Sequence, residues 1–297
     1  MITIINDKTQ MISKLCLTQK GMTYGKFMSL LKKKNIKINN QKTNKDIIIN
    51  KGDEVKIYGF ETIDKKPKFD IIFEDENLII INKPKGIQVK KEDVCDNKLC
   101  IEDYFDAKCV HRLDRNTSGL LILAKSDKVK EEFKKAFSNH QVEKYYKALC
   151  YGTFVKKEDV LKGYLVKDSQ TKLSKVVNTN IPNSSPITTE YKVIKDYGGV
   201  TLVEIKLITG KTHQIRAHLT SINHSIVGDR KYQNKEFALA NKKNEKYIKS
   251  QCLIAYKLKF NFDKNSFLSY LNEYEFKIDS NFENEFKALG LNEGKND

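Results

Sequence analysis

The segment His111-Arg112-Leu113-Asp114-Arg115-Asn116-Thr117-Ser118-Gly119 decides how the rest of the chain is interpreted. Asp114 stands between two arginines, and it is followed by side chains that bond to local backbone and by a glycine free to adopt positive φ. This pattern predicts a loop that presents a side chain. The flanking cations favour the ionised carboxylate that a nucleophile or a base needs. Taken alone, however, the segment fits a salt-bridged loop aspartate better than a catalytic one.

The segments around this loop predict a mixed sheet flanked by helices, an α+β fold. Residues 78–81 and 120–124 are apolar throughout, which is typical of buried strands, whereas residues 144–151 and 201–207 alternate. Further strands are predicted at 36–38, 53–58 and 71–73, and helices at about 24–34, from Ser126 or Asp127, and from Thr212.

The chain divides by composition into two predicted domains. Residues 1–60 form a small unit in which Asn39-Asn40 predicts a tight turn. A polar stretch at 61–69, with Lys65-Lys66-Pro67-Lys68 at its centre, is the candidate linker. Residues 70–290 form the larger domain.

The composition favours an anionic partner. The 297 residues carry 54 Lys and Arg against 38 Asp and Glu, a formal charge of +16 that suits a phosphate-rich ligand. An AT-rich genome that loads the surface with lysine would give the same balance. The first residues lack a secretory signal, and no stretch approaches the ~20 apolar residues of a spanning helix, so we expect a cytoplasmic protein with reduced cysteines.

Arginine is confined to two short glycine-containing segments. Of the 54 basic residues only four are arginine, and they stand at positions 112, 115, 216 and 230. Because the guanidinium fork grips carboxylates and phosphates bidentately and stacks on bases, a lysine-biased chain should keep arginine where the fork matters. These two segments are therefore the candidate site.

Other motifs fail on spacing. Gly210-Lys211-Thr212 lacks the earlier glycine of a phosphate-binding loop, because that position is Ile205. The Arg and Asp of the 111–119 segment are separated by a leucine, unlike a kinase catalytic loop. His213 and His218 are five residues apart and do not share a helix face, so we expect no metal site.

Two further segments supply partners for Asp114. In the helix predicted from Thr212, Ile215 points inward while Arg216 lies on an adjoining face and can point into a cleft. On the strand at 144–151, Tyr146 shares a face with Ala148 and can stack on a nucleobase, although a packing tyrosine is the commoner outcome.

With these segments the chain resembles the RluA-type pseudouridine synthases, whose hallmark His-Arg-Leu-Asp-x-x-Thr-Ser-Gly stands complete at 111–119. The similarity extends to four ordered motifs over about 160 residues, the others being Glu74-Asp75 through Gly86, Lys144-x-Tyr146-x-Ala148, and residues 209–218 with Gly228-Asp229-x-x-Tyr232. Residues 1–60 resemble the small α-L-type RNA-binding domain, but lack its usual Arg-Leu-Asp. Asn223 to Ser225 and Ile254 also depart from the family pattern.

The resemblance implies an RNA-modifying enzyme that works without cofactor or metal. It detaches uracil from ribose, rotates it and rejoins it through C5, after flipping the uridine into a pocket. Asp114 is implied as nucleophile or base, Arg216 as its ion-pair partner, and Tyr146 as the residue that stacks on uracil and could take the C5 proton. The implied substrate-binding residues are Arg112, which fills the gap left by the flipped base, Arg115, Ile215 in the pocket wall, and Lys83 as a phosphate contact near the entrance.

Two other classes of function compete with this interpretation. A non-catalytic RNA-binding or ribosome-assembly factor could keep the fold for its surface, although the intact Asp114, Tyr146 and Arg216 argue against it. A nuclease would need clustered carboxylates and a divalent metal, but Asp114 has arginines as its immediate neighbours. Within the enzyme interpretation, large-subunit ribosomal RNA is the expected substrate, transfer RNA is the alternative, and the protein is expected to be a monomer.

Overall fold

The computed structural model describes residues 1–20, 22, 24–59, 69–90, 100–168, 173–279 and 282–291. The contacts divide the chain into two units: residues 1–70 with 87–108, and residues 71–86 with 109–297. Apart from Phe69, the predicted linker at 61–69 lies outside the described residues.

The first unit holds a small antiparallel sheet and two helices. The sheet has the order β1-β6-β3-β4, and β2 pairs with β5. The elements are β1 (Ile2–Ile5), β2 (Gln10–Met11), α1 (Ile12–Lys20), α2 (Tyr24–Lys32), β3 (Ile36–Ile38), β4 (Gln41–Thr43), β5 (Ile48–Ile49) and β6 (Glu54–Ile57), with a 3-10 helix at Ile101–Asp103. Asn39 and Asn40 both have positive φ, 47° and 66°, as a two-residue hairpin turn requires, so the predicted turn is confirmed.

A core closes this unit between the sheet and the helices. Phe27 and Leu31 of α2 are buried together with Ile36 of β3 and Val55 of β6. The predicted helix and the two predicted strands are thus confirmed, whereas β1, β2, α1, β4 and β5 were not predicted.

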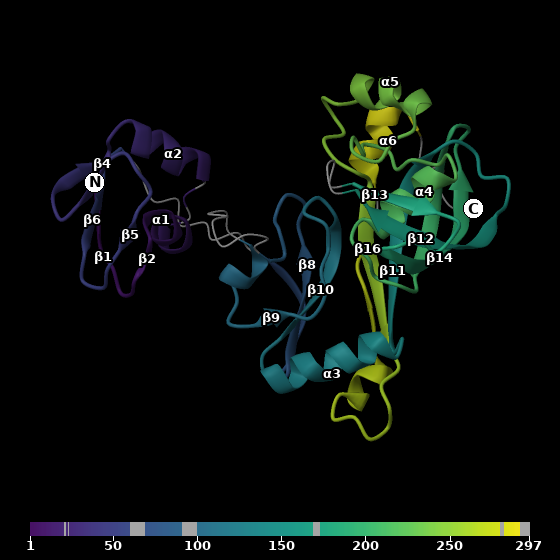
Figure 1. The fold of residues 1–297 in the computed structure, drawn as a ribbon, viewed down its shortest axis with the longest axis horizontal. Coiled ribbons are helices and arrows are strands. Elements are labelled where there is room, and N and C mark those ends of the chain that lie inside the picture. Colours follow the sequence, from purple (N-terminus) through teal and green to yellow (C-terminus); the bar gives the residue numbers. More distant parts are fainter. Residues whose placement is uncertain are drawn as a thin grey trace. The chain divides into compact units, whose positions relative to one another are not determined.

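The second unit is built on one large sheet, which confirms the predicted α+β class (Figure 1). The main path of the sheet is β13-β12-β14-β15-β11-β16-β10-β8-β7, with β17 on β16. Its elements are β7 (Asp70–Glu74), β8 (Leu78–Lys83), β9 (Lys108–Cys109), β10 (Ser118–Ala124), α3 (Asp127–Ser138), β11 (Val142–Tyr151), β12 (Glu158–Lys167), β13 (Ser174–Val177), β14 (Ser184–Asp196), β15 (Val200–Leu207), α4 (Gln214–Ser221), α5 (Lys235–Lys243), β16 (Leu253–Phe260), a 3-10 helix at Ser269–Glu273, β17 (Glu275–Lys277) and α6 (Glu283–Leu289).

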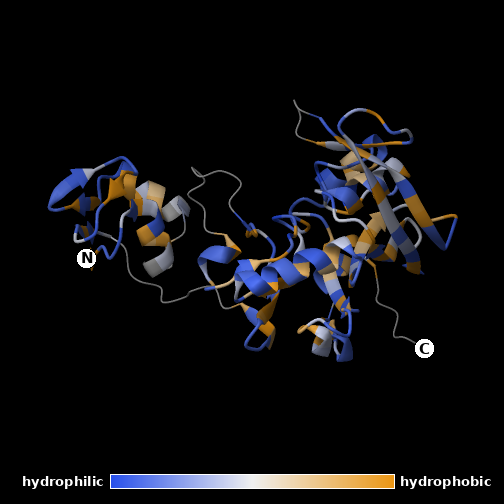
Figure 2. Ribbon diagram, turned by 60° about the horizontal axis from the view of Figure 1, so that its bottom comes forward, coloured by the Kyte–Doolittle hydropathy of each residue, from blue (hydrophilic) through white to orange (hydrophobic). Residues whose placement is uncertain are grey.

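Two helices pack on different parts of this sheet: α3 contacts β10, and α4 contacts β13 and β14. The Ser126 hydroxyl caps α3 by accepting a hydrogen bond from the Val129 amide, as predicted. Val129 and Phe133 are buried, and the Phe133 ring meets Phe260 of β16 edge-on. Figure 2 shows hydrophobic and hydrophilic residues mixed along both helices and strands, as expected of elements that bury one face.

Gly119 fixes how the central strands meet. The backbone of β10 runs parallel to β16, with Ser118 beside Ile254 and Gly119 beside Ala255. At Gly119 φ is +117°, and a Cβ would lie 2.1 Å from the carbonyl oxygen of Ala255. Only glycine permits this approach, so the last residue of the 111–119 segment sets the junction from which the Asp114 loop projects.

Candidate active site

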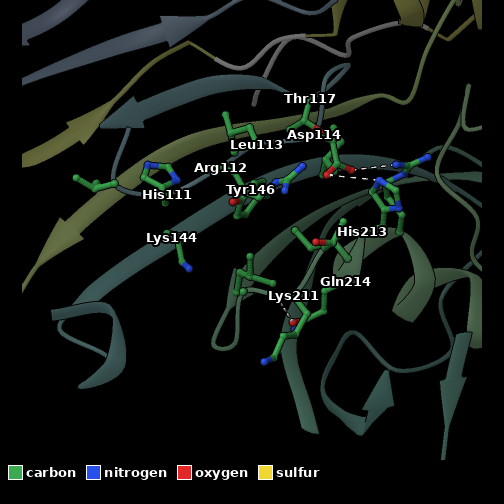
Figure 3. Close-up of a pocket in the computed structure, with 17 residues that line it drawn as sticks. His111, Arg112, Leu113, Asp114, Thr117, Lys144, Tyr146, Lys211, His213 and Gln214 are labelled. Atoms are coloured by element: carbon green, nitrogen blue, oxygen red, sulfur yellow. Dashed lines mark hydrogen bonds and ion pairs between the residues drawn. The ribbon is translucent and has the colours of Figure 1, made fainter. Parts of the chain in front are cut away.

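A pocket of about 270 Å³ lies where the predicted segments converge (Figure 3). Residues 110–114 form one wall, Lys144 and Tyr146 of β11 form a second, and residues 210–216 at the start of α4 form a third. The 111–119 loop, the β11 strand and the α4 segment are therefore brought together, as the sequence analysis expected.

Asp114 and Arg216 form an ion pair in this pocket. The Arg216 Nη1 donates to Asp114 Oδ2 at 3.0 Å. The Arg216 side chain is 6% exposed, whereas the Asp114 side chain retains 18% exposure. The Asp114 carboxylate therefore lines the pocket, and the more buried Arg216 side chain holds it in place.

Asp229 is the second partner of Arg216. Its Oδ2 accepts from Arg216 Nε at 2.6 Å and its Oδ1 accepts from Nη2 at 2.9 Å, which makes a bidentate pair. The Asp229 side chain is 1% exposed. Burial would lower the pKa of Arg216, but hydrogen bonding and charge from Asp229, joined by Asp114, raise it overall. The guanidinium thus stays charged and its fork is fixed.

Asp229 is itself held by backbone, because its Oδ1 accepts from the amides of Lys231 and Tyr232 at 3.0 Å each. Asp229 belongs to the motif Gly228-Asp229-x-x-Tyr232, but its role as a partner of Arg216 was not predicted. Its position beside Gly228 and three residues before Tyr232, within a motif of the family, was the sequence feature that could have identified it as a site residue.

Tyr146 lies buried on β11, 5% exposed, and lines the pocket. Ala148, predicted on the same face, is buried as well, and so is Cys150. Burial, and secondarily the charge of Asp114, raise the pKa of the Tyr146 phenol. The phenol therefore stays protonated at neutral pH.

The four arginines line two hollows that share Asp114 and Arg216. Arg112 is exposed and lines the main pocket. Arg115 and Arg230 line a second hollow of about 350 Å³. The sequence-based expectation that arginine marks one site agrees with this placement.

Ile215 and Lys83 differ in how they relate to the pocket. Ile215 lines its wall and is 5% exposed. Lys83 is fully buried, not near the entrance, and its Nζ donates to the carbonyl oxygens of Pro84 at 2.9 Å and Arg115 at 3.1 Å. Burial lowers its pKa to about 8, opposed by the charge of Asp114. In this position Lys83 ties the loop after β8 to the Asp114 loop instead of meeting a phosphate at the surface.

His213 also faces Asp114, from the start of α4. Its Nε2 lies 3.9 Å from Asp114 Oδ1, and its Nδ1 shares a hydrogen bond of 3.0 Å with the Tyr232 hydroxyl. The residue adopts a left-handed conformation, φ 58°, as N-cap of α4. The predicted helix therefore begins at Gln214, two residues later than expected.

Neither a metal cluster nor a membrane span is found in the described part of the chain. No three His, Cys, Asp or Glu side chains gather there in a way that could hold a metal ion. No helix among those residues is long and apolar enough to cross a bilayer.

Comparisons with known proteins place this arrangement in a family. Residues 77–221 match the family model described as RNA pseudouridylate synthase. An uncharacterised RNA pseudouridine synthase of Mycoplasma pneumoniae is 32% identical over 300 residues, 90% of this chain and 90% of that protein. The chain belongs to the RluA-type RNA pseudouridine synthases. A further relative, ribosomal large subunit pseudouridine synthase C of Buchnera aphidicola, is 30% identical over 82% of this chain and 84% of its own length.

The fold of this RNA pseudouridine synthase agrees with a solved structure. Human RNA pseudouridylate synthase domain containing 4 superposes with a TM-score of 0.58 at 23% identity, over 76% of this chain and 95% of that one. Membership of the synthase family, shown by the family model and the relatives, makes the protein an isomerase, and the nuclease alternative is set aside.

Proposed function

We propose that this synthase isomerises specific uridines of large-subunit ribosomal RNA, with Asp114 as the catalytic carboxylate. The observation that carries the proposal is the pocket that the Asp114 carboxylate lines while Arg216 holds it at 3.0 Å. The relative named as a large-subunit enzyme supports the choice of RNA. Such a substrate also agrees with a net charge of +16.

The reaction is balanced within the substrate and water. The N1–C1′ bond breaks with its electron pair going to uracil, the base rotates, and C5 bonds to C1′. C5 then loses its proton and N1 gains one, so no oxidant or reductant is needed. Asp114 would either attack C1′ or remove a proton from the sugar, and both roles need the carboxylate form.

Arg216 and Asp229 act as a fixed support for that carboxylate. A guanidinium that is already bidentate to Asp229 has one direction left for Asp114, and this fixes the rotamer of the carboxylate before RNA binds. Such prior positioning is worth several kcal/mol in a chemical step.

Tyr146 is assigned to stacking on the flipped uracil. Because burial keeps its phenol protonated, it can accept the C5 proton only if it passes its own proton on at the same time. The carboxylate of Asp114, whose charge reaches the phenol, is the proposed acceptor. Stacking contributes about 1–3 kcal/mol per base.

The exposed arginines are assigned to the RNA around the flipped nucleotide. Arg112, at the surface of the pocket, would enter the gap that the uridine leaves. Arg115 and Arg230, which line the second hollow with Lys249, would meet backbone phosphates. The Arg115 Nε also donates to the Gly86 carbonyl at 3.0 Å, which orients its side chain.

Pseudouridine maps of total RNA test the proposed substrate. Cells that lack the gene should lose pseudouridine at one or a few large-subunit positions, and the wild-type gene should restore it whereas an Asp114→Asn gene should not. Losses confined to transfer RNA would contradict the choice of substrate. An unchanged map would favour a non-catalytic RNA-binding factor.

A further inference from the structure

Lys144 is a pocket cation without a carboxylate partner among the described residues. It lies on β11 two residues before Tyr146, and the two side chains share a strand face and line the same pocket. Its Nζ lies 5.0 Å from the centre of the Phe137 ring. Burial lowers its pKa to about 8, and no neighbouring charge offsets that effect.

The position of Lys144 is opposite to that of Asp114. Figure 3 shows Asp114, Tyr146 and Lys144 in that order along the pocket, with His111 on the same side as Lys144. Two residues along a strand span ~6.6 Å, which is longer than the path from the sugar-bonded nitrogen of a pyrimidine to its opposite carbonyl oxygen, so a base stacked on Tyr146 fits within that spacing. A uridine with its sugar at Asp114 and its base along Tyr146 therefore directs the far edge of the base to Lys144.

That far edge distinguishes uracil from cytosine. Uracil presents the O4 acceptor there, whereas cytosine presents an amino donor. A lysine ammonium has three donors and no acceptor. We propose that Lys144 donates a hydrogen bond to O4 of the flipped uracil and so selects uracil over cytosine. This assignment rests on the proposed function, because it requires a uridine in the pocket.

The same contact suits the rotation of the base. When the bond from C1′ is exchanged from N1 to C5, the carbonyl opposite the sugar changes from C4=O4 to C2=O2. One fixed donor therefore serves the substrate and the product. Between them the detached uracil carries the electron pair of the broken bond, spread over both carbonyl oxygens, and a cation at this edge stabilises it. Lys144 should thus affect the chemical step more than RNA affinity.

His111 adds no competing charge at this end of the pocket. Its Nε2 accepts from the Ile122 amide at 3.1 Å. Burial, reinforced by the charge of Lys144, lowers the pKa of His111 to about 3. The imidazole is therefore neutral at physiological pH and adds no charge beside Lys144.

Single-turnover isomerisation of a short RNA that carries one mapped target tests the assignment. The target is either uridine or 4-thiouridine, whose sulfur is a poorer acceptor, and the enzymes are wild type, Lys144→Met and Lys144→Arg. We expect Lys144→Met to slow the uridine reaction by about 10- to 100-fold, the usual value of a hydrogen bond to a charged group, with RNA affinity close to wild type. Lys144→Arg should recover part of the rate, and 4-thiouridine should slow wild type but leave Lys144→Met unaffected.

The matched control is Lys147→Met, a lysine on the same strand whose Nζ lies over the Tyr256 ring at 4.9 Å and which does not line the pocket. It should behave as wild type with both targets. An equal loss on 4-thiouridine in wild type and Lys144→Met would overturn the assignment, because the two changes would then be independent. Weaker RNA binding with an unchanged single-turnover rate would overturn it too, by indicating a phosphate contact. A wild-type enzyme inactive on uridine would instead overturn the proposed function.

Discussion

Replacement of Asp229 by alanine tests whether the buried Arg216 depends on its bidentate partner. The Arg216 and Asp229 side chains are only 6% and 1% exposed. The substitution leaves a buried cation with Asp114 alone, and it removes the acceptor of the Lys231 and Tyr232 amides. Removing one partner of such a pair costs about 3–5 kcal/mol. For a domain of 150–250 residues this corresponds to a fall in Tm of roughly 6–20 °C, at about 2–4 °C per kcal/mol.

The control is the exposed pair of Arg230 and Glu245, whose Nη1 to Oε1 distance is 2.9 Å with side chains 45% and 54% exposed. Glu245→Ala should cost less than about 1 kcal/mol. Thermal and denaturant unfolding of both variants measures the difference. Asp229→Ala melting as close to wild type as Glu245→Ala would refute the reasoning, because the buried pair would then contribute no more than an exposed one.

Three further predictions concern other parts of the catalytic unit. Arg216→Lys should lose nearly all isomerisation activity while RNA binding persists, since lysine cannot hold Asp114 and Asp229 together. Single-turnover rates measure the activity and binding titrations measure the RNA affinity. A single-turnover rate near that of wild type would contradict this prediction. Gly119→Ala should fail to fold stably because its Cβ would meet the Ala255 carbonyl at 2.1 Å. Gly86→Ala, whose Cβ would have no atom within 4 Å, should cost only about 1–2 kcal/mol of left-handed backbone strain. Soluble yield and Tm compare the two variants, and an equal fall in Tm for both would contradict the packing explanation. Burial lowers the pKa of His218 to about 4, below its unfolded value, so the stability due to neutral His218 is full above about pH 6.5 and is lost as the pH falls toward 4. His218→Gln should therefore reduce the pH dependence of the free energy of unfolding by about 1.4 kcal/mol per pH unit in that range. The same pH dependence in wild type and His218→Gln would contradict this assignment.

The central part of the site was predictable because local sequence carries its signal. The charge of the 111–119 segment marked Asp114, and helix periodicity placed Arg216 toward a cleft, but the ion pair between them was implied by the family resemblance. Their contact at 3.0 Å joins residues 102 positions apart. The buried strands β8 and β10 were predicted from continuous apolar runs, since a strand covered on both faces has no polar positions.

What the sequence did not predict depends on tertiary contacts. Asp229 lies in a loop, where no periodicity marks a buried carboxylate. Lys83 was expected near the pocket entrance because the family resemblance implied a phosphate contact there, whereas it is fully buried and two backbone carbonyls compensate its burial. Strands β12 and β14 were not predicted, because half-exposed strands rich in lysine, glutamate and threonine resemble loops until their partners are known.

Tritium release from RNA labelled at C5 of uridine is the most direct test of Asp114 as the catalytic carboxylate. Purified wild-type enzyme should release tritium as it forms pseudouridine, and Asp114→Asn should release none above background while it binds the same RNA with affinity close to wild type. Release by Asp114→Asn at the wild-type rate would contradict the central claim.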